Sequence, residues 1–201
     1  MHTPGILKIF TTTDMKFIYS FTEETQPQFS EVGGKAYALL ELTKAEFPVP
    51  KGFVCSQAFF QEWMTAVTQT EEWVTLQKAL KVNTDIHEAT TAVQQVIRSF
   101  SMTSAQQVSL NQALGYFPVG HRVAVRSSSP EEDLGSASFA GMYKTLLGVN
   151  HVDLSGAIRE VFCSAFDERV FHYKRQKGFA LDQVQIAVIV MEQIDATSAG
   201  V

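Results

Sequence analysis

Residues 184–191, VQIAVIVM, form a run that is almost entirely apolar and rich in β-branched side chains. Such a run is typical of a strand that is buried on both faces, because its side chains do not alternate between apolar and polar. This feature constrains the fold most, since both faces of the strand have to be covered. Its longest apolar part, residues 186–191, is far shorter than the ~18 residues that a membrane span requires.

Four other segments predict shorter strands, at residues 17–21, 52–55, 121–126 and 145–149. Apolar residues at helical spacing follow Gly33, and the stretch 71–114 predicts three short helices with breaks near Asn83 and Ser101. Another helix is expected after Asp153. Because helices and strands do not alternate in strict βαβ order, we expect an α+β fold that has a mixed sheet with a helical insertion.

The composition is that of an ordinary folded protein, since 45% of the 201 residues are hydrophobic and 18% are charged. The net charge of −5 argues against a general binder of nucleic acid or acidic membranes, because such surfaces need clustered cations. The five histidines lack ligand spacing, and Cys55 and Cys163 are most simply two buried, reduced thiols. No secretory signal is visible, so we expect a cytoplasmic protein.

The motif Gly33-Gly34-Lys35 is the first candidate for chemistry, and we expect it at the N-terminus of a helix. The free N–H groups and the dipole of such an end attract phosphate. Two glycines let a ligand approach the main chain, and Lys35 adds a mobile positive charge. The motif alone is weak evidence, because Gly-Gly turns before helices are common and a lysine there is usually a solvated surface residue.

Arg126 ends a predicted strand and is followed by three serines, which gather a planar donor fork and three hydroxyls at one place. Strand ends of this kind commonly carry binding sites. The alternative is that Arg126 forms a plain surface ion pair with one of the acidic residues at 131–133, worth ~1 kcal/mol or less.

Residues 135–141, GSASFAG, carry almost only small side chains, so their backbone can fold over a bulky anion and present its amides. Phe139 is the exception, and we expect it to anchor this loop in the core. Thr145 follows four residues after Gly141, within reach of the same ligand. A flexible linker is the alternative, but linkers rarely carry an apolar anchor between two strands.

Several segments together carry a family resemblance: VRSSS at 125–129, EDL at 132–134 and SFAG at 138–141. Supporting matches are VGGK at 32–35, VPKGF at 49–53, AFDER at 165–169, YKR at 173–175 and SAGV at 198–201. In this order they resemble the N-terminal nucleotide-binding segment of the pyruvate phosphate dikinase and phosphoenolpyruvate synthase family, which includes rifampin phosphotransferase. The resemblance covers residues 30–201, with a looser fit in the mid-chain helices.

The resemblance implies an ATP-grasp fold, in which two lobes hold ATP between them, and it assigns this chain to the N-terminal lobe. Residues 1–29 would form an N-terminal extension and a first strand. Residues 30–201 would form the N-terminal part of the nucleotide-binding domain, with a helical subregion at about 57–115. We expect the chain to be truncated before the second lobe.

By match of motif, the resemblance implies that Lys35 and Arg126 contact the phosphates of ATP. Arg126 would also be catalytic, because it would stabilise the charge that develops during phosphoryl transfer. Gly141 would offer its amide to the phosphates, and Thr145 its hydroxyl.

The adenine edge falls at residues 191–194 by the same resemblance. Met191 stands where the family usually has a glutamine, and Ile194 closes this edge. Adenine is commonly held there by main-chain groups, so the substitution need not abolish binding. Glu192 is a candidate acceptor for the exocyclic amine.

The resemblance further implies ATP as cofactor and Mg²⁺ held through the second lobe. Phosphoryl groups would pass from ATP to a histidine on a swivelling phosphohistidine domain and then to pyruvate, as in phosphoenolpyruvate synthase. Pyruvate phosphate dikinase and rifampin phosphotransferase are close alternatives, because they differ in the acceptor domain. A non-catalytic nucleotide-binding module and a purely structural domain also stay open. Neither nucleic acid nor a membrane is an expected partner.

Overall fold

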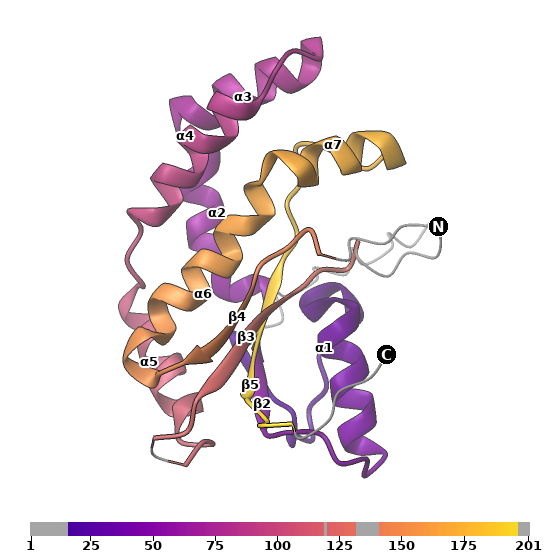
Figure 1. Ribbon diagram of the computed structural model, residues 1–201, viewed down its shortest axis with the longest axis vertical. Coiled ribbons are helices and arrows are strands. Elements are labelled where there is room, and N and C mark those ends of the chain that lie inside the picture. Colours follow the sequence, from indigo (N-terminus) through magenta and orange to yellow (C-terminus); the bar gives the residue numbers. More distant parts are fainter. Residues whose placement is uncertain (1–15, 119, 132–140, 197–201) are drawn as a thin grey trace, which may run out of the picture.

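The strand predicted from the apolar run is the middle strand of a five-stranded sheet (Figure 1). A computed structural model describes residues 16–118, 120–131 and 141–196. The order across the sheet is β1-β2-β5-β3-β4. The strands are β1 (Ile18–Ser20), β2 (Gly52–Cys55), β3 (Val123–Ser128), β4 (Thr145–Val149) and β5 (Ala187–Glu192).

All four strand pairings are antiparallel. The expectation of a mixed sheet is therefore wrong for the described strands, whereas the α+β class is confirmed. The cause lies in the connections, because helices carry the chain from the end of β4 back along the sheet. As a result β5 begins beside the end of β3, where Ala187 pairs with Ser128, and it runs against β3.

One face of the sheet is covered by α1 (Phe29–Lys44), whose residues Val32, Ala36 and Leu40 are buried. They pack against Val54 of β2 and Ile189 of β5. Gly33 has non-helical dihedrals (φ 76°, ψ 168°), and it divides α1 at a kink. A helix therefore does begin after Gly33, as the motif predicts, whereas the short helical segment before it, which starts at Phe29, was not predicted.

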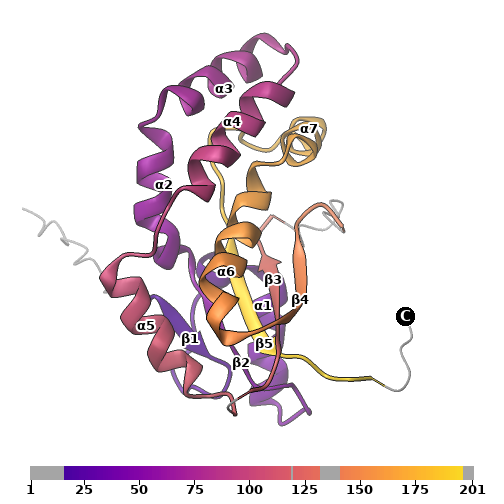
Figure 2. The same cartoon turned by 60° about the vertical axis from the view of Figure 1, so that its left-hand side comes forward.

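The opposite face is covered by a larger layer of helices (Figure 2). Phe60 and Phe162 stack at its centre with ring centroids 4.8 Å apart, which adds ~0.5–1.5 kcal/mol to the free energy gained by burial. Both faces of β5 are thus covered, as its sequence requires. The helices here are α2 (Gln61–Thr68), α3 (Glu71–Val82), α4 (His87–Arg98), α5 (Ser104–Leu114) and α6 (Leu154–Cys163), with 3₁₀ turns η1 (Gln57–Phe60), η2 (His151–Asp153) and η3 (Ser164–Phe166).

The three helices predicted between residues 71 and 114 are confirmed, as are the breaks between them. Asn83 ends α3 in the left-handed conformation, with φ 55°. The last helix, α7 (Glu168–Lys177), extends past the end of the sheet (Figure 1). None of the described helices is long and apolar enough to cross a membrane.

Candidate functional site

The kink of α1 lies directly against the end of β3. A Cβ atom at Gly33 would be 2.7 Å from the carbonyl carbons of Ser128 and Ser129. The Ala36 N–H, which follows the kink, donates to Ser128 Oγ at 3.0 Å. The structure thus joins two of the sequence motifs, the glycine pair and the serines after Arg126. It also shows that one of the amides expected for phosphate already has a protein acceptor.

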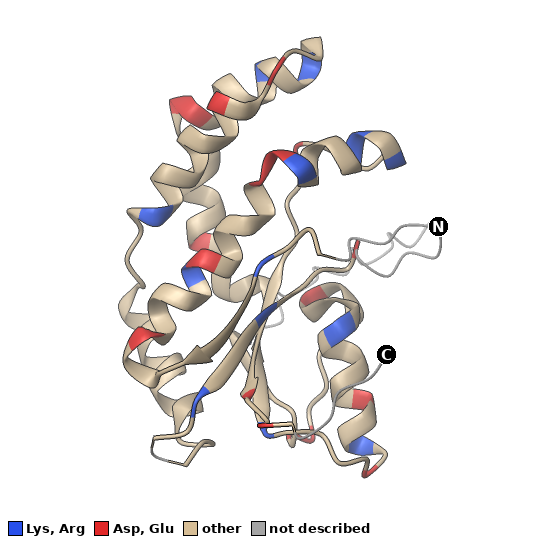
Figure 3. Ribbon diagram, in the orientation of Figure 1, with Lys and Arg blue, Asp and Glu red and all other residues tan. Residues whose placement is uncertain are grey.

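Arg126 and Thr145 are direct partners across β3 and β4. Directly paired residues of an antiparallel sheet point to the same face, and both side chains are exposed. Arg126 also pairs with Ile189, which packs under α1. Both therefore lie on the α1 face. In Figure 3 the basic residue of β3 and the basic residue in the early part of α1 are marked in blue.

Lys35 is half-buried on α1, between Gly33 and Ala36. Since both of these neighbours contact the end of β3, the backbone of Lys35 lies close to the strand that carries Arg126. The structure therefore brings Lys35, Arg126 and Thr145 to one end of one sheet face.

Gly141 lies elsewhere among the described residues. It is exposed with φ 74°, and it lines a hollow of about 320 Å³ between α4, α6 and the start of α7. Arg98, Lys144 and Glu160 also line this hollow. It lies on the side of α4 and α6, whereas Arg126 faces α1. The rest of the predicted small-residue loop, residues 135–140 with Phe139, lies outside the described residues.

The predicted adenine edge is at the other end of β5. Met191 packs against the cluster under α1, whereas Glu192 pairs with Val123 and points to the opposite face. Glu192 Oε1 is 2.8 Å from His121 Nδ1, so this carboxylate already has a partner. Ile194 is exposed, beyond the end of the strand.

A hollow of about 410 Å³ lies at this edge. Three residues along β5 separate Glu192 from Ile189, the partner of Arg126, which corresponds to about 10 Å at ~3.4 Å per residue. The hollow at this edge is lined by Gly120, His121, Arg122, Glu192, Gln193 and Asp195.

The acidic residues after β3 give Arg126 no partner within the described segments. Glu131 instead forms an ion pair with Lys174 of α7, with Oε1 and Nζ 3.0 Å apart. The alternative pairing of Arg126 with Glu131 is therefore wrong, and residues 132–133 lie outside the described residues. Burial lowers the pKa of Lys174, and the charge of Glu131 opposes this shift. Sequence reasoning missed this pair, although Lys174 belongs to the YKR match.

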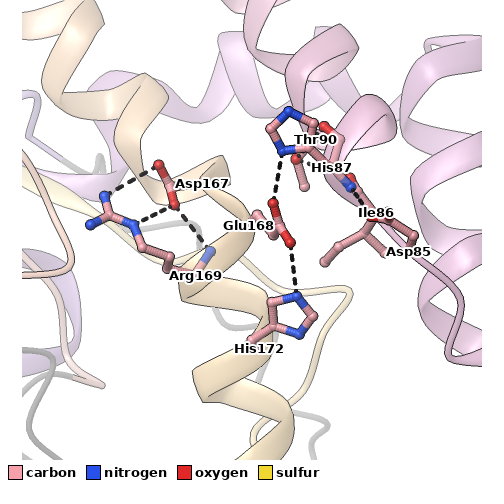
Figure 4. Close-up of polar contacts among 8 residues, drawn as sticks. All are labelled: Asp85, Ile86, His87, Thr90, Asp167, Glu168, Arg169 and His172. Atoms are coloured by element: carbon pink, nitrogen blue, oxygen red, sulfur yellow. Dashed lines mark hydrogen bonds and ion pairs between the residues drawn. The ribbon is translucent and has the colours of Figure 1, made fainter.

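A second polar cluster joins α4 to α7 on the surface (Figure 4). Glu168 accepts from both imidazoles, with His87 Nδ1 at 2.9 Å and His172 Nε2 at 3.1 Å. Asp167 holds the guanidinium of Arg169 beside it, with Oδ1 and Nε 2.9 Å apart. Among the residues that the structure describes, no group of three or more His, Cys, Asp or Glu side chains is arranged to hold a metal ion.

Comparison with known proteins decides the family. Residues 29–201 match the family described as "Pyruvate phosphate dikinase, AMP/ATP-binding domain". The chain belongs to this family. The resemblance inferred from the sequence is thus confirmed, and the kink of α1, Arg126 and Thr145 all lie within the matched residues.

The relatives are much longer proteins. The chain is 32% identical to the probable phosphoenolpyruvate synthase of Methanothermobacter thermautotrophicus, over 93% of this chain and 28% of the relative. It is 32% identical to the rifampicin phosphotransferase of Bacillus subtilis, over 89% and 21%. For the phosphoenolpyruvate synthase of Pyrococcus furiosus the identity is 28%, over 92% and 28%. The chain thus spans about a quarter of the length of these relatives.

Proposed function

We propose that this chain is the ATP-binding lobe of an ATP-dependent phosphotransferase, and that Lys35, Arg126 and Thr145 hold the phosphates of ATP. The observation that carries the proposal is the meeting of the α1 kink with the end of β3, beside an exposed arginine without an ion pair among the described residues. Family membership supports a nucleotide as the ligand.

Each of these residues suits the chemistry of phosphoryl transfer. The guanidinium of Arg126 presents a planar fork of donors that matches phosphate oxygens and keeps its charge at any working pH. Lys35 adds a compact, mobile charge, and the Thr145 hydroxyl can donate from the neighbouring strand. During transfer, charge develops on the phosphoryl oxygens, and donors that are already in place stabilise it.

The opposite end of β5 is the proposed adenine edge, about 10 Å along the strand from Arg126. Since Glu192 already contacts His121 and points to the other face, we assign recognition of the base to the main chain at residues 191–194. Met191 and Ile194 supply apolar surface for it. Gly141 lies on the side of α4 and α6, away from Arg126, so we do not include its amide in the proposed phosphate site.

The whole protein would be a dikinase of ATP-grasp architecture similar to phosphoenolpyruvate synthase. Its second lobe would supply Mg²⁺ ligands, and a phosphohistidine domain would carry the phosphoryl group to pyruvate. The acceptor is open between relatives, because the rifampicin phosphotransferase of Bacillus subtilis is as similar to this chain as the archaeal synthase. A cytoplasmic location belongs to the same proposal.

The test is the affinity for ATP of the wild-type chain and of Arg126→Ala, measured by calorimetry. Loss of hydrogen bonds from a charged donor commonly removes about 2 kcal/mol, which is roughly thirtyfold in Kd. Lys81→Ala removes the same charge from an exposed position on α3, and it should bind ATP as the wild type does. An effect of Arg126→Ala below threefold, or an equal effect of Lys81→Ala, would refute the assignment.

A further inference from the structure

Lys174 is a charged side chain that is almost completely buried, with 1% of its surface exposed. Its ammonium group donates to the Gln183 carbonyl and forms an ion pair with Glu131 at 3.0 Å. Removing two charges from water is unfavourable, and apolar residues of similar volume are often as stable or more stable at such positions. Stability alone therefore does not explain why α7 places a lysine here.

The partner of Lys174 belongs to the turn that follows β3. Glu131 lies three residues after Ser128, and its N–H donates to Ser129 Oγ at 3.2 Å. The turn is thus held from α7 through Glu131. It is also held from α1, where the Ala36 N–H donates to Ser128 Oγ. Together with the pairing of Ser128 with Ala187 of β5, these two anchors hold the end of β3 beside the kink of α1.

We propose that Lys174 is a positioning residue of the phosphate site, because it holds Glu131 and with it the end of β3 that carries Arg126. This inference rests on the proposed function. Lys174 is not expected to touch ATP itself, since it is buried and already occupied by Glu131 and Gln183. Its effect is transmitted through the turn, and it acts on the phosphates rather than on the base.

The test compares Kd values for ATP and AMP, because AMP lacks the β- and γ-phosphates. The main variant is the double substitution Lys174→Met with Glu131→Leu, which removes both charges and so leaves no unpaired one in the interior. We expect it to remain folded and to bind ATP at least about tenfold more weakly, because a displaced Arg126 would lose part of its charge-assisted hydrogen bonding to the phosphates. Its Kd for AMP should stay within about twofold of the wild type.

Two further variants serve as controls, one that keeps the ion pair with Glu131 and one that removes a positive charge elsewhere on α7. Lys174→Arg keeps a charged donor for Glu131, and its Kd for ATP should stay within about threefold of the wild type. Lys177→Met removes the same charge from an exposed position of α7 and should change neither Kd. Urea unfolding of each variant shows whether it is folded. If the double variant does not fold, Glu131→Asp, which keeps both charges but shortens the reach by one methylene, is expected to show the same selective loss for ATP.

Wild-type affinity for ATP in the folded double variant would overturn the inference, as would equal losses for ATP and AMP. Where only Glu131→Asp folds, unchanged ATP affinity in that variant has the same meaning. A wild-type chain that binds neither nucleotide would instead refute the proposed function itself, and the inference with it.

Discussion

Gly33 is a residue at which one added methyl group should strongly disturb this fold. Its dihedrals, φ 76° and ψ 168°, lie in a region that residues with a Cβ almost never adopt, and holding alanine there costs about 1–3 kcal/mol. The new Cβ would also lie 2.7 Å from the carbonyl carbons of Ser128 and Ser129. These are main-chain atoms, so no side-chain rotation relieves the contact.

Overpacking of this kind costs a further ~1–3 kcal/mol. Together the two effects predict that Gly33→Ala lowers the free energy of unfolding by about 4 kcal/mol, a large share of the ~5–15 kcal/mol of a typical domain. The measurement is urea denaturation with linear extrapolation, compared with the wild type. Two other glycines of this chain offer matched controls.

Gly141 also has a positive φ, 74°, but no atom of the described residues lies within 4 Å of the position that a Cβ would occupy there, so alanine should cost only ~1–2 kcal/mol of strain. Gly156 lies inside α6 with open space around it, and alanine should stabilise the chain by up to ~1 kcal/mol. A loss below 1 kcal/mol for Gly33→Ala, or a loss no larger than that for Gly141→Ala, would refute the reasoning.

Two further predictions concern titration. The hydrogen bond and charge of Glu168 raise the pKa of His87 above its usual 6.5, so this contact stabilises the fold at pH below the unfolded pKa, and the gain is lost as pH rises through the folded pKa. NMR titration should show the raised pKa in the wild type and a return toward 6.5 in Glu168→Gln; an unchanged pKa would contradict the contact. Burial raises the pKa of Cys55 and raises that of Cys163 to about 11, so both thiols should resist iodoacetamide at pH 8 until urea unfolds the chain, and rapid labelling of the folded chain would contradict this.

Local sequence patterns were sufficient for most of the elements. The strands at Gly52–Cys55 and Thr145–Val149 have the predicted bounds. The start of α1 was missed because Gln28 is an unusual residue before a helix. There the Gln28 N–H donates to the Glu31 carboxylate at 2.6 Å, which stabilises a first turn ahead of the glycines.

The arrangement of the candidate site was harder to predict, because it depends on register and on long-range contacts. Arg126 faces Thr145 in a hairpin whose register shifts between Val123 and Val125, and a shift of one residue reverses the face of a side chain. The pair of Glu131 with Lys174 has no local signature at all. The acidic residues at 131–133 lie close to Arg126 in the sequence and therefore predicted an ion pair with it. The observed partner of Glu131, Lys174, lies on α7, far along the chain.

Three features at or next to the end of β3 are each unfavourable for stability. Gly33 occupies a conformation reserved for glycine, Lys174 is a buried charge, and Arg126 stays exposed without an ion pair among the described residues. Natural sequences follow local rules nearly everywhere, and departures from them concentrate at functional sites. Three such departures connected through Ser128 and Glu131 are better explained by one shared requirement than by three unrelated ones. A site that must hold a polyphosphate supplies that requirement, since it needs close backbone approach, an exposed cation and a fixed strand end at the same place.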